Sequence, residues 1–441
     1  MTIPSFTGYQ TAYSGLEAAQ AAIDTTGENI SNANTPGYTR QVVNTGEAGS
    51  LEIPQRSEQG AHAQLGTGVD VTSISRIRDQ FLDIQYRAQN TASSNANTNS
   101  TELQQVQTAL NEPSTSGVST QLDNFYSAWS SLASSQSSST EGNVISAGQT
   151  LVSTLNSTYQ QMQTVQTQAQ QQLATLTGAN GQVEQDATKL ATLNGQITEA
   201  TQAGQTPNDL LDQRDNVLDD LSGLAQISVT NQTDGSVTVG FGDAATPLVS
   251  GTTVTWPQSL TSPTKTGGQL GALMSLSDTS SSGTIQQYMN SLSSIAGQIT
   301  TSVNALQSPS SPFFSGTLGS ISSPLAVSAT ASSVQSSSSS TSGADLAQSI
   351  ANLSGGAASQ SYAAFVSQIG SGVQAAESTQ STSAAVLAAV SNQRQSVSGV
   401  SLDQEMTNLI NYQQAYQASA RVMNAMDSAL NTLITTVGAG L

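Results

Sequence analysis

A cluster of five aspartates is the part of the sequence whose residue types could do chemistry. Its members recur at helical spacing and alternate with leucines: Asp209, Asp212, Asp215, Asp219 and Asp220. Carboxylates are ligands that Ca²⁺ prefers, but a calcium loop needs acids at alternate positions around a central glycine. The spacing therefore predicts the solvated face of a helix, with a cation site as the alternative.

Motifs that depend on histidine or cysteine are missing. His62 is the only histidine and cysteine is absent, which excludes HExxH zinc sites, thiolate metal sites and cysteine nucleophiles. The glycine pairs 66 and 68, and 240 and 242, lack the third glycine of a dinucleotide fingerprint, and there is no P-loop. Paired-carboxylate hydrolysis stays open, although nothing positions such a pair. We therefore expect no enzyme activity, no cofactor and no metal.

Composition and charge restrict the partners. The 441 residues include only 9% charged side chains, and the net charge is −19. A chain without basic clusters cannot neutralise phosphates or anionic headgroups, which argues against nucleic acid and membrane partners. The longest run of small apolar residues, 384–390, is too short to span a bilayer, and no signal peptide is visible. We expect a soluble chain that is either cytoplasmic or exported without a cleaved signal.

The elements that must position these residues are mainly helices, and the longest is expected at the C-terminus. Residues 400–437 contain neither glycine nor proline. Steps of three and four residues select an apolar stripe that only Glu405 and Ser419 interrupt: Leu402, Leu409, Tyr412, Tyr416, Met423, Met426, Leu430, Leu433 and Val437. This periodicity predicts a coiled-coil seam of about five heptads.

A shorter stripe lies near the N-terminus, where Leu16, Ile23 and Ile30 recur at heptad spacing. The helix is expected to end near Ser31, because Pro36 disfavours helical geometry at the preceding residue. Such stripes either cover the core of their own domain or pack against each other and against neighbouring subunits. The stripes at both ends favour an assembly protein with a subunit interface.

Between the ends, helical stripes alternate with a small β element. Apolar periodicity predicts helices over 144–176, 183–200, 207–224 and 285–306, and residues 227–241 read as a hairpin around Asp234 and Gly235. Thr206 is expected to cap the third of these helices. The Ser/Asn/Thr-rich patches 91–100 and 130–140 read as loops or weak helix starts. The Ser/Pro-rich stretch 309–343 reads as a loop.

These elements predict a mainly α fold whose domains are discontinuous in sequence and nest around one axis. We expect a terminal coiled-coil core domain from residues 1–35 with 400–441. A mainly helical middle domain is expected from 36–308 with 344–399, including the β hairpin at 226–256. Residues 309–343 form a loop or a reduced outer domain.

Both ends of the chain resemble the flagellar axial proteins, which form the rod, the hook and the hook–filament junction of bacteria. The first signature covers residues 14–41 and reads SGLEAAQAAIDTTGENISNANTPGYTRQ. The second covers residues 399–422 and reads GVSLDQEMTNLINYQQAYQASARV. Within that family, the segment NDLLDQRD at 208–215 and the hairpin after it are similar to the hook-associated protein 1 subfamily.

The resemblance implies a structural adaptor at the hook–filament junction that is required for filament assembly and motility. It implies an extracellular location reached by type III export, and terminal helices that order only on assembly. Expected partners are further copies in a tube, hook protein, the second junction protein (hook-associated protein 3) and an export chaperone. The chaperone would bind Leu409, Tyr416, Met423 and Leu430. A hook or distal-rod subunit is the alternative, and an exported effector or adhesin is a third reading.

Overall fold

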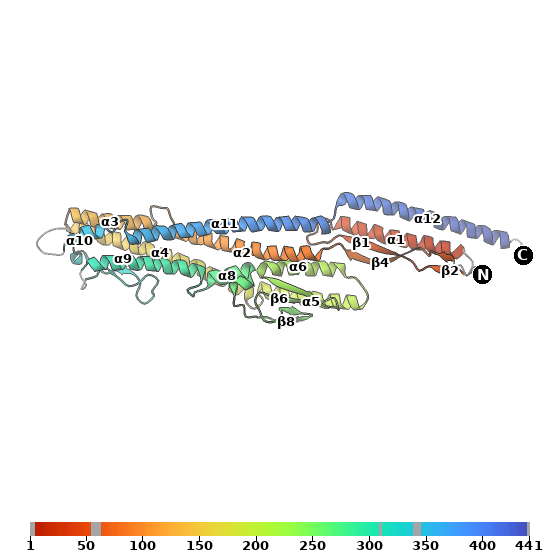
Figure 1. The fold of residues 1–441 in the computed structure, drawn as a ribbon, viewed down its shortest axis with the longest axis horizontal. Coiled ribbons are helices and arrows are strands. Elements are labelled where there is room, and N and C mark those ends of the chain that lie inside the picture. Colours follow the sequence, from red (N-terminus) through yellow and green to blue (C-terminus); the bar gives the residue numbers. More distant parts are fainter. Residues whose placement is uncertain (1–4, 54–62, 308–310, 338–344, 439–441) are drawn as a thin grey trace.

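The protein is an elongated bundle of long helices, described for residues 5–53, 63–307, 311–337 and 345–438 by a computed structural model (Figure 1). The helices run roughly along one axis, and the few strands are short. This arrangement confirms the expected mainly α fold. Within these residues, no helix is both long enough and apolar enough to cross a membrane.

One end of the molecule is built from the two ends of the chain. The helices are α1 (Ser5–Ser31) and α12 (Leu402–Gly438), and the strands beside α1 are β1 (Gln41–Glu47), β2 (Leu51–Ile53), β3 (Ala63–Leu65) and β4 (Val69–Arg76). Strands β1 and β4 pair antiparallel from Gln41 opposite Arg76 to Glu47 opposite Val69, and they pack on α1. The sequence placed residues from 36 onward in the middle domain, whereas this hairpin belongs with α1.

The far end of the molecule is a helical bundle. Its helices are α2 (Gln80–Leu110), α3 (Val118–Ser134), α4 (Ser138–Thr177), α9 (Thr284–Leu306), α10 (Asp345–Ala351) and α11 (Ala357–Ser398). Helix α11 packs along α2, so the last third of the chain returns onto the first. The core contains a cluster of aromatic rings in tilted and edge-on contact, with Phe125 and Trp129 of α3 against Phe313.

A smaller lobe lies beside the bundle and holds the β element. It comprises α5 (Gln182–Gln202), α6 (Asn208–Leu224), α7 (Pro263–Thr266), α8 (Gly268–Ser277) and a sheet of β5 (Ile227–Asn231), β6 (Val237–Phe241), β7 (Val249–Ser250) and β8 (Thr253–Val254). The expected hairpin is confirmed, because Ile227 pairs with Phe241 and Asn231 with Val237 around a Gly235 with positive φ. The expected break between 176 and 183 is confirmed as well.

Two local predictions were wrong. The patch 91–100 lies inside α2, because Ala96, Thr98 and Ser100 are small enough to be buried where other helices pack closely. Thr206 does not cap α6; Pro207 stands at the N-cap position, and it makes no side-chain capping bond. The loop or reduced outer domain predicted at 309–343 lies partly outside the described residues. Its described part, 311–337, is mostly irregular, contains β9 (Phe314–Ser315), β10 (Ala326–Val327) and the 3₁₀ turn Ala331–Ser333, and packs into the bundle core through Phe313.

Candidate assembly site

Helices α1 and α12 form an antiparallel pair with a regular register. A Cβ atom added to Gly8 would touch the side chain of Met426, and one added to Gly15 would lie 3.9 Å from Cβ of Ser419. Nearer the middle of the molecule, Asn29 bonds to Glu405. The start of α1 and the end of α12 therefore lie together at the tip of the molecule (Figure 1).

The predicted interface residues lie on these two helices. On α12, the side chains of Leu409, Tyr412, Tyr416, Met423, Met426 and Leu430 are half-buried, and we call them the seam. On α1, Leu16, Ile23 and Ile30 are also half-buried, while the buried positions are small, such as Ala19 and Ala22. Leu402 is exposed, and the side chains of Leu433 and Val437 lie outside the described residues.

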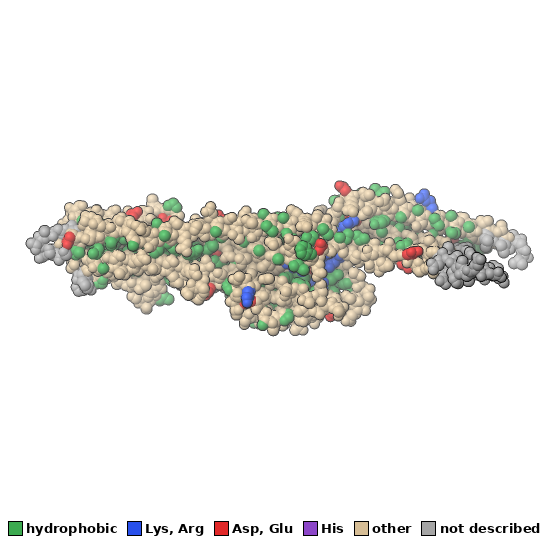
Figure 2. All heavy atoms as spheres, in the orientation of Figure 1, with side chains coloured by type: hydrophobic (Ala, Val, Ile, Leu, Met, Phe, Trp, Pro, Cys, Tyr) green, Lys and Arg blue, Asp and Glu red, His purple; other side chains and the backbone are tan. Residues whose placement is uncertain are grey.

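A second apolar row on α12 contains two residues that the sequence reading missed, Met406 and Ile410, and one that it assigned to the seam, Leu402. Leu402, Met406 and Ile410 are spaced by four residues and are 49%, 50% and 52% exposed, and we call them the outer stripe. Apolar side chains at such spacing share one helix face. The four-residue spacing of this row is visible in the sequence, but the reading followed the longer apolar row of the seam instead. Figure 2 shows one face of the molecule, on which hydrophobic side chains are scattered among uncharged polar side chains and backbone.

Three polar side chains close the inner end of the α1–α12 pair, and we call them the polar clamp: Asn29, Arg40 and Glu405. Asn29 Nδ2 donates to Glu405 Oε2 at 3.1 Å, and Arg40 Nε donates to Glu405 Oε1 at 2.8 Å. Asn29 and Glu405 are each only 1% exposed. A buried carboxylate is tolerated when charged and polar donors satisfy both of its oxygens, as they do here.

The aspartate cluster proved to be part of a second, larger network. We call it the ionic joint, and its members are Arg76, Arg78, Arg87, Asp212, Asp215, Asp219 and Arg394. Arg76 Nη1 donates to Asp212 Oδ1 at 2.6 Å and to Asp215 Oδ2 at 2.9 Å. The predicted solvated face is therefore wrong for Asp212 and Asp215, which are buried because arginines distant in sequence neutralise them.

The remaining contacts of the ionic joint tie α6 to α2 and α11. Arg87 Nε donates to Asp219 Oδ1 at 2.9 Å, and Arg394 Nη1 donates to Asp219 Oδ2 at 2.6 Å. The guanidinium of Arg394 also lies 3.7 Å from the ring centre of Tyr86, a cation–π contact. Helix α6 is thereby attached to the start of α2 and to the end of α11.

Burial and charge pull against each other at Asp215. Burial raises the pKa of its carboxyl, but Arg78, Arg76 and Arg87 outweigh burial and hold the pKa below the ordinary value of 3.8. Burial lowers the pKa of the neighbouring Arg214 guanidinium, whose Nη1 donates to the carbonyl oxygen of Gly235. The joint therefore favours the ionised form of Asp215, whose charge the neighbouring arginines neutralise.

The turn between α1 and β1 contacts the same helix α6. The backbone N–H of Thr39 donates to Asp212 Oδ2 at 3.0 Å, and Asn208 Nδ2 donates to Gln41 Oε1 at 2.8 Å. Gly37 has a φ of 79°, and a Cβ there would overlap the side chain of Asn216. The turn residues of the N-terminal signature thus attach the terminal pair to the lobe.

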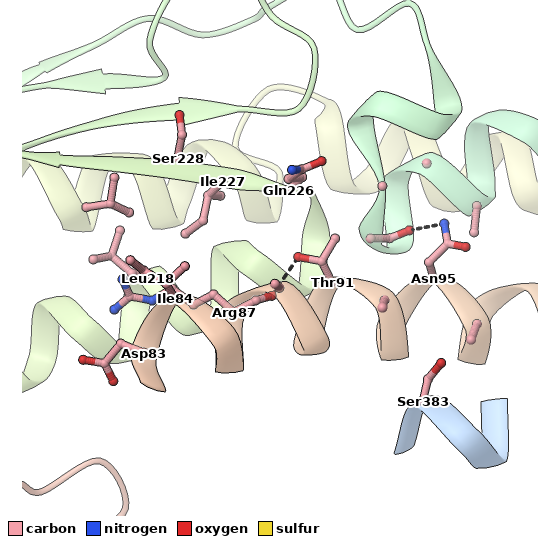
Figure 3. Close-up of a pocket in the computed structure, with 18 of the residues that line it drawn as sticks. Asp83, Ile84, Arg87, Thr91, Asn95, Leu218, Gln226, Ile227, Ser228 and Ser383 are labelled. Atoms are coloured by element: carbon pink, nitrogen blue, oxygen red, sulfur yellow. Dashed lines mark hydrogen bonds between the residues drawn. The ribbon is translucent and has the colours of Figure 1, made fainter. Parts of the chain in front are cut away.

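A groove of about 1270 Å³ lies between α2, α8, α11 and β5 (Figure 3). Several polar groups on its wall already have partners: Thr91 donates to the carbonyl oxygen of Ser222, Asn95 to that of Gly268, and Arg87 binds the ionic joint. Among the described residues, no group of three His, Cys, Asp or Glu side chains could hold a metal ion. His62 lies outside the described residues.

Comparison with known families gives three matches in chain order. Residues 10–39 match the family described as flagella basal body rod protein, and residues 103–320 match the flagellar hook-associated protein FlgK helical domain. Residues 391–436 match the flagellar basal body rod FlgEFG protein C-terminal family. The two terminal matches contain most of α1 and most of α12, and the central match contains the aspartate cluster.

Individual relatives agree with these matches. The chain is 28% identical to flagellar hook-associated protein 1 of Bacillus subtilis, with 99% of both chains covered. It is 32% identical to flagellar hook-associated protein 1 of Escherichia coli over 55% of this chain and 43% of that protein.

Among solved structures, the flagellar hook junction protein FlgK from Burkholderia pseudomallei is 26% identical, with a TM-score of 0.44, over 51% of this chain and 43% of that chain. The resemblance noted at both ends of the sequence is confirmed by the central family match and by the Bacillus subtilis relative, which extend through its middle. Over nearly its whole length the chain is similar to flagellar hook-associated protein 1, and it is a structural protein of the bacterial flagellum.

Proposed function

We propose that this chain is an adaptor at the hook–filament junction, where its α1–α12 pair packs beside the pairs of neighbouring copies in a tube. The observation that carries the proposal is that α12 has two apolar rows. The seam is half-buried in the α1–α12 pair, whereas the outer stripe is half exposed. Burying the outer stripe between copies would supply stabilisation that a two-helix pair lacks alone.

The middle of the chain would supply stiffness and a surface for other junction proteins. The turn after α1 attaches the terminal pair to the lobe, and the ionic joint ties the lobe to α2 and α11, which continue to the far end (Figure 1). Hook protein on one side and hook-associated protein 3 on the other are the proposed partners. The role is structural, without catalysis, because the polar side chains around the groove and the joint mainly bind one another.

Before assembly, we propose that the terminal helices are loosely paired and that an export chaperone binds the seam. Leu409, Tyr416, Met423 and Leu430 lie within one face of α12, and α1 covers the same face in the folded chain. The chaperone and α1 would then compete for these side chains. Export through the flagellar type III apparatus would be followed by pairing of α12 with α1 in the tube.

A deletion strain tests the proposed function. The strain should make complete hooks, release filament subunits into the medium and fail to swim, and the wild-type gene should restore filaments. Immuno-gold labelling should give a single band between hook and filament. Labelling along the whole hook would instead support the alternative, a hook or distal-rod subunit. Normal filaments and motility in the deletion strain would contradict both readings.

A further inference from the structure

One line of residues on the face of α1 that contacts α12 consists of small residues only. Positions 8, 15 and 22, spaced by one heptad along α1, are glycine, glycine and alanine, and they follow the line on which Gly8 meets Met426 and Gly15 meets Ser419. Large side chains on one helix normally fix the register by fitting specific holes on the other. Small residues repeated at heptad spacing make each hole similar to the next.

A shift of α12 by one heptad would therefore change the packing of this line only slightly. In one direction Gly15 would face Met426, and in the other Gly8 would face Ser419. Both arrangements again place a glycine of α1 opposite Met426 or Ser419. Packing along this line distinguishes weakly between the three registers.

The polar clamp reacts differently to the same shift. The shift that places Gly8 opposite Ser419 would also place Glu405 opposite Ala22, which offers no hydrogen-bond donor. The shift that places Gly15 opposite Met426 would place Asn29 opposite Tyr412 and carry Glu405 past the end of α1. In either case a group that is now 1% exposed loses its partners, which costs several kcal/mol for a buried charge or amide.

We propose that the Asn29–Glu405 contact, reinforced by Arg40, specifies the register of the α1–α12 pair. Glu405 is a positioning residue: it contributes specificity at a seam position where an apolar residue would pack as well. In coiled coils, a single buried polar residue at a core position can specify the register at some cost in stability. The pairing of the two helices carries this inference, whatever place the protein has in the flagellum.

The register also sets the position of the rest of the chain. The backbone N–H of Arg40 donates to the carbonyl oxygen of Ser398, the last residue of α11, at 2.9 Å, while its side chain holds Glu405 in α12. One arginine thus fixes the helix pair and the end of α11 together. A slipped pair would break one of these two contacts.

Disulfide trapping can test the register directly, because the chain has no cysteine of its own. The pair G15C/S419C reports the observed register, since the two Cβ atoms would lie 3.9 Å apart, within the range that a disulfide requires. The pairs G8C/S419C and G15C/M426C report the two slipped registers, and each is separated by about 10 Å along the helix in the observed one. Each pair is placed in the full-length chain.

The purified chains are oxidised at low concentration, and intramolecular disulfides are quantified by peptide mass spectrometry. The parent should form the G15C/S419C bond at least about tenfold faster than either slipped pair, and Glu405→Leu should lower this ratio by about tenfold or more. Glu405→Gln should keep most of the preference, because its oxygen still accepts from Asn29. The matched control is Gln404→Leu, the same kind of change at an exposed neighbour, which should leave the ratio unchanged.

Asn29→Ala provides a second variant if Glu405→Leu does not fold, as judged by circular dichroism. It should shift the ratio in the same direction. A Glu405→Leu or Asn29→Ala chain that folds and keeps the parental ratio within about twofold would overturn the proposal, since a lost buried contact should cost more than that. A parent chain that forms all three disulfides at similar rates, or none of them, would overturn it as well.

Discussion

Arg40 and Glu405 are separated by 365 residues in sequence, yet Arg40 Nε lies 2.8 Å from Glu405 Oε1. The contact joins the N-terminal signature of the chain to the C-terminal one. It is also nearly inaccessible to water, because the Glu405 side chain is 2% exposed. The ends of this protein are therefore attached to each other by an ion pair as well as by helix packing.

Removing one partner of this pair should be more damaging than removing both. Arg40→Met leaves Glu405 buried with Asn29 alone, and we expect a loss of about 3–5 kcal/mol in the stability of the terminal pair. The double variant Arg40→Met with Glu405→Leu should recover most of that loss. Hydrogen exchange of α1 and α12 in the full-length chain measures both effects. Equal protection in the parent and in Arg40→Met would contradict this expectation.

Charges in the seam should block incorporation into the flagellum. Leu409→Asp combined with Met423→Asp places two carboxylates where α12 packs on α1, at a cost of several kcal/mol. The matched control is Gln413→Asp with Asn424→Asp, which adds the same charges at exposed positions of the same helix. Complementation of a deletion strain, scored by filament attachment, should fail for the first pair and succeed for the second. Attached filaments in both strains would contradict packing of the seam.

The outer stripe should matter for assembly and not for the folded monomer. Ile410→Glu changes a side chain that is 52% exposed, so the free energy of unfolding should stay within about 0.5 kcal/mol of the parent value. Incorporation into flagella should nevertheless drop sharply, because neighbouring copies would have to bury the charge. Gln414→Glu, also on α12 and exposed, is the control. Normal incorporation of Ile410→Glu would show that the stripe stays in water.

Acid should weaken the ionic joint. The pKa of Asp215 is lower in the folded chain than its ordinary value of 3.8, so its stabilising contribution is complete above that value and is lost as the pH falls through the folded pKa. Asp215→Asn should reduce stability near neutral pH and flatten the loss of stability below about pH 4. Urea unfolding at a series of pH values measures this.

Asp186→Asn is the control for the acid experiment. Burial raises the pKa of Asp186, so ionisation of this carboxyl opposes folding and the sign of its contribution is reversed. Its replacement should leave the acid-induced loss in place. If the free energy of unfolding of Asp215→Asn fell at low pH as steeply as that of the parent, groups other than Asp215 would be responsible for the loss.

The turn after α1 should be intolerant of a side chain. Gly37→Ala introduces a residue at a φ of 79° and a methyl group against Asn216, which should cost more than about 1 kcal/mol. Gly27→Ala is the matched control, because Gly27 is helical and has no neighbour within 4 Å of an added Cβ. That change should be neutral or stabilise by up to about 1 kcal/mol. Thermal unfolding of both variants against the parent measures the difference.

The sequence predicted those parts of the fold that local patterns determine. Helix α12 and the hairpin of β5 and β6 follow from periodicity and from Asp234 and Gly235, which concern neighbouring residues only. The ionic joint could not be read in this way, because Asp215 pairs with Arg76 and Arg87, which lie 139 and 128 residues earlier. Each charge alone is typical of a solvated surface, and only the fold brings them together.

The candidate site was likewise predicted only in part from the sequence. Glu405 stood out in the sequence as a polar interruption of the seam, but its partners became visible only with the fold. The patch 91–100 shows the opposite limit, since small polar residues weaken helix propensity while permitting the close packing of α2. Tertiary contact outweighed local preference there.

The arrangement of the chain ends determines where a tag can be attached to this protein. A fluorescent or affinity tag fused to either terminus would sit at the tip formed by α1 and α12, on the surface proposed to assemble (Figure 1). The turn between β9 and β10 offers a better attachment point, because Ile321 is 99% exposed and both strands pack on α4 or α9 in the bundle. A short epitope inserted there should label the protein without touching the helices that pair.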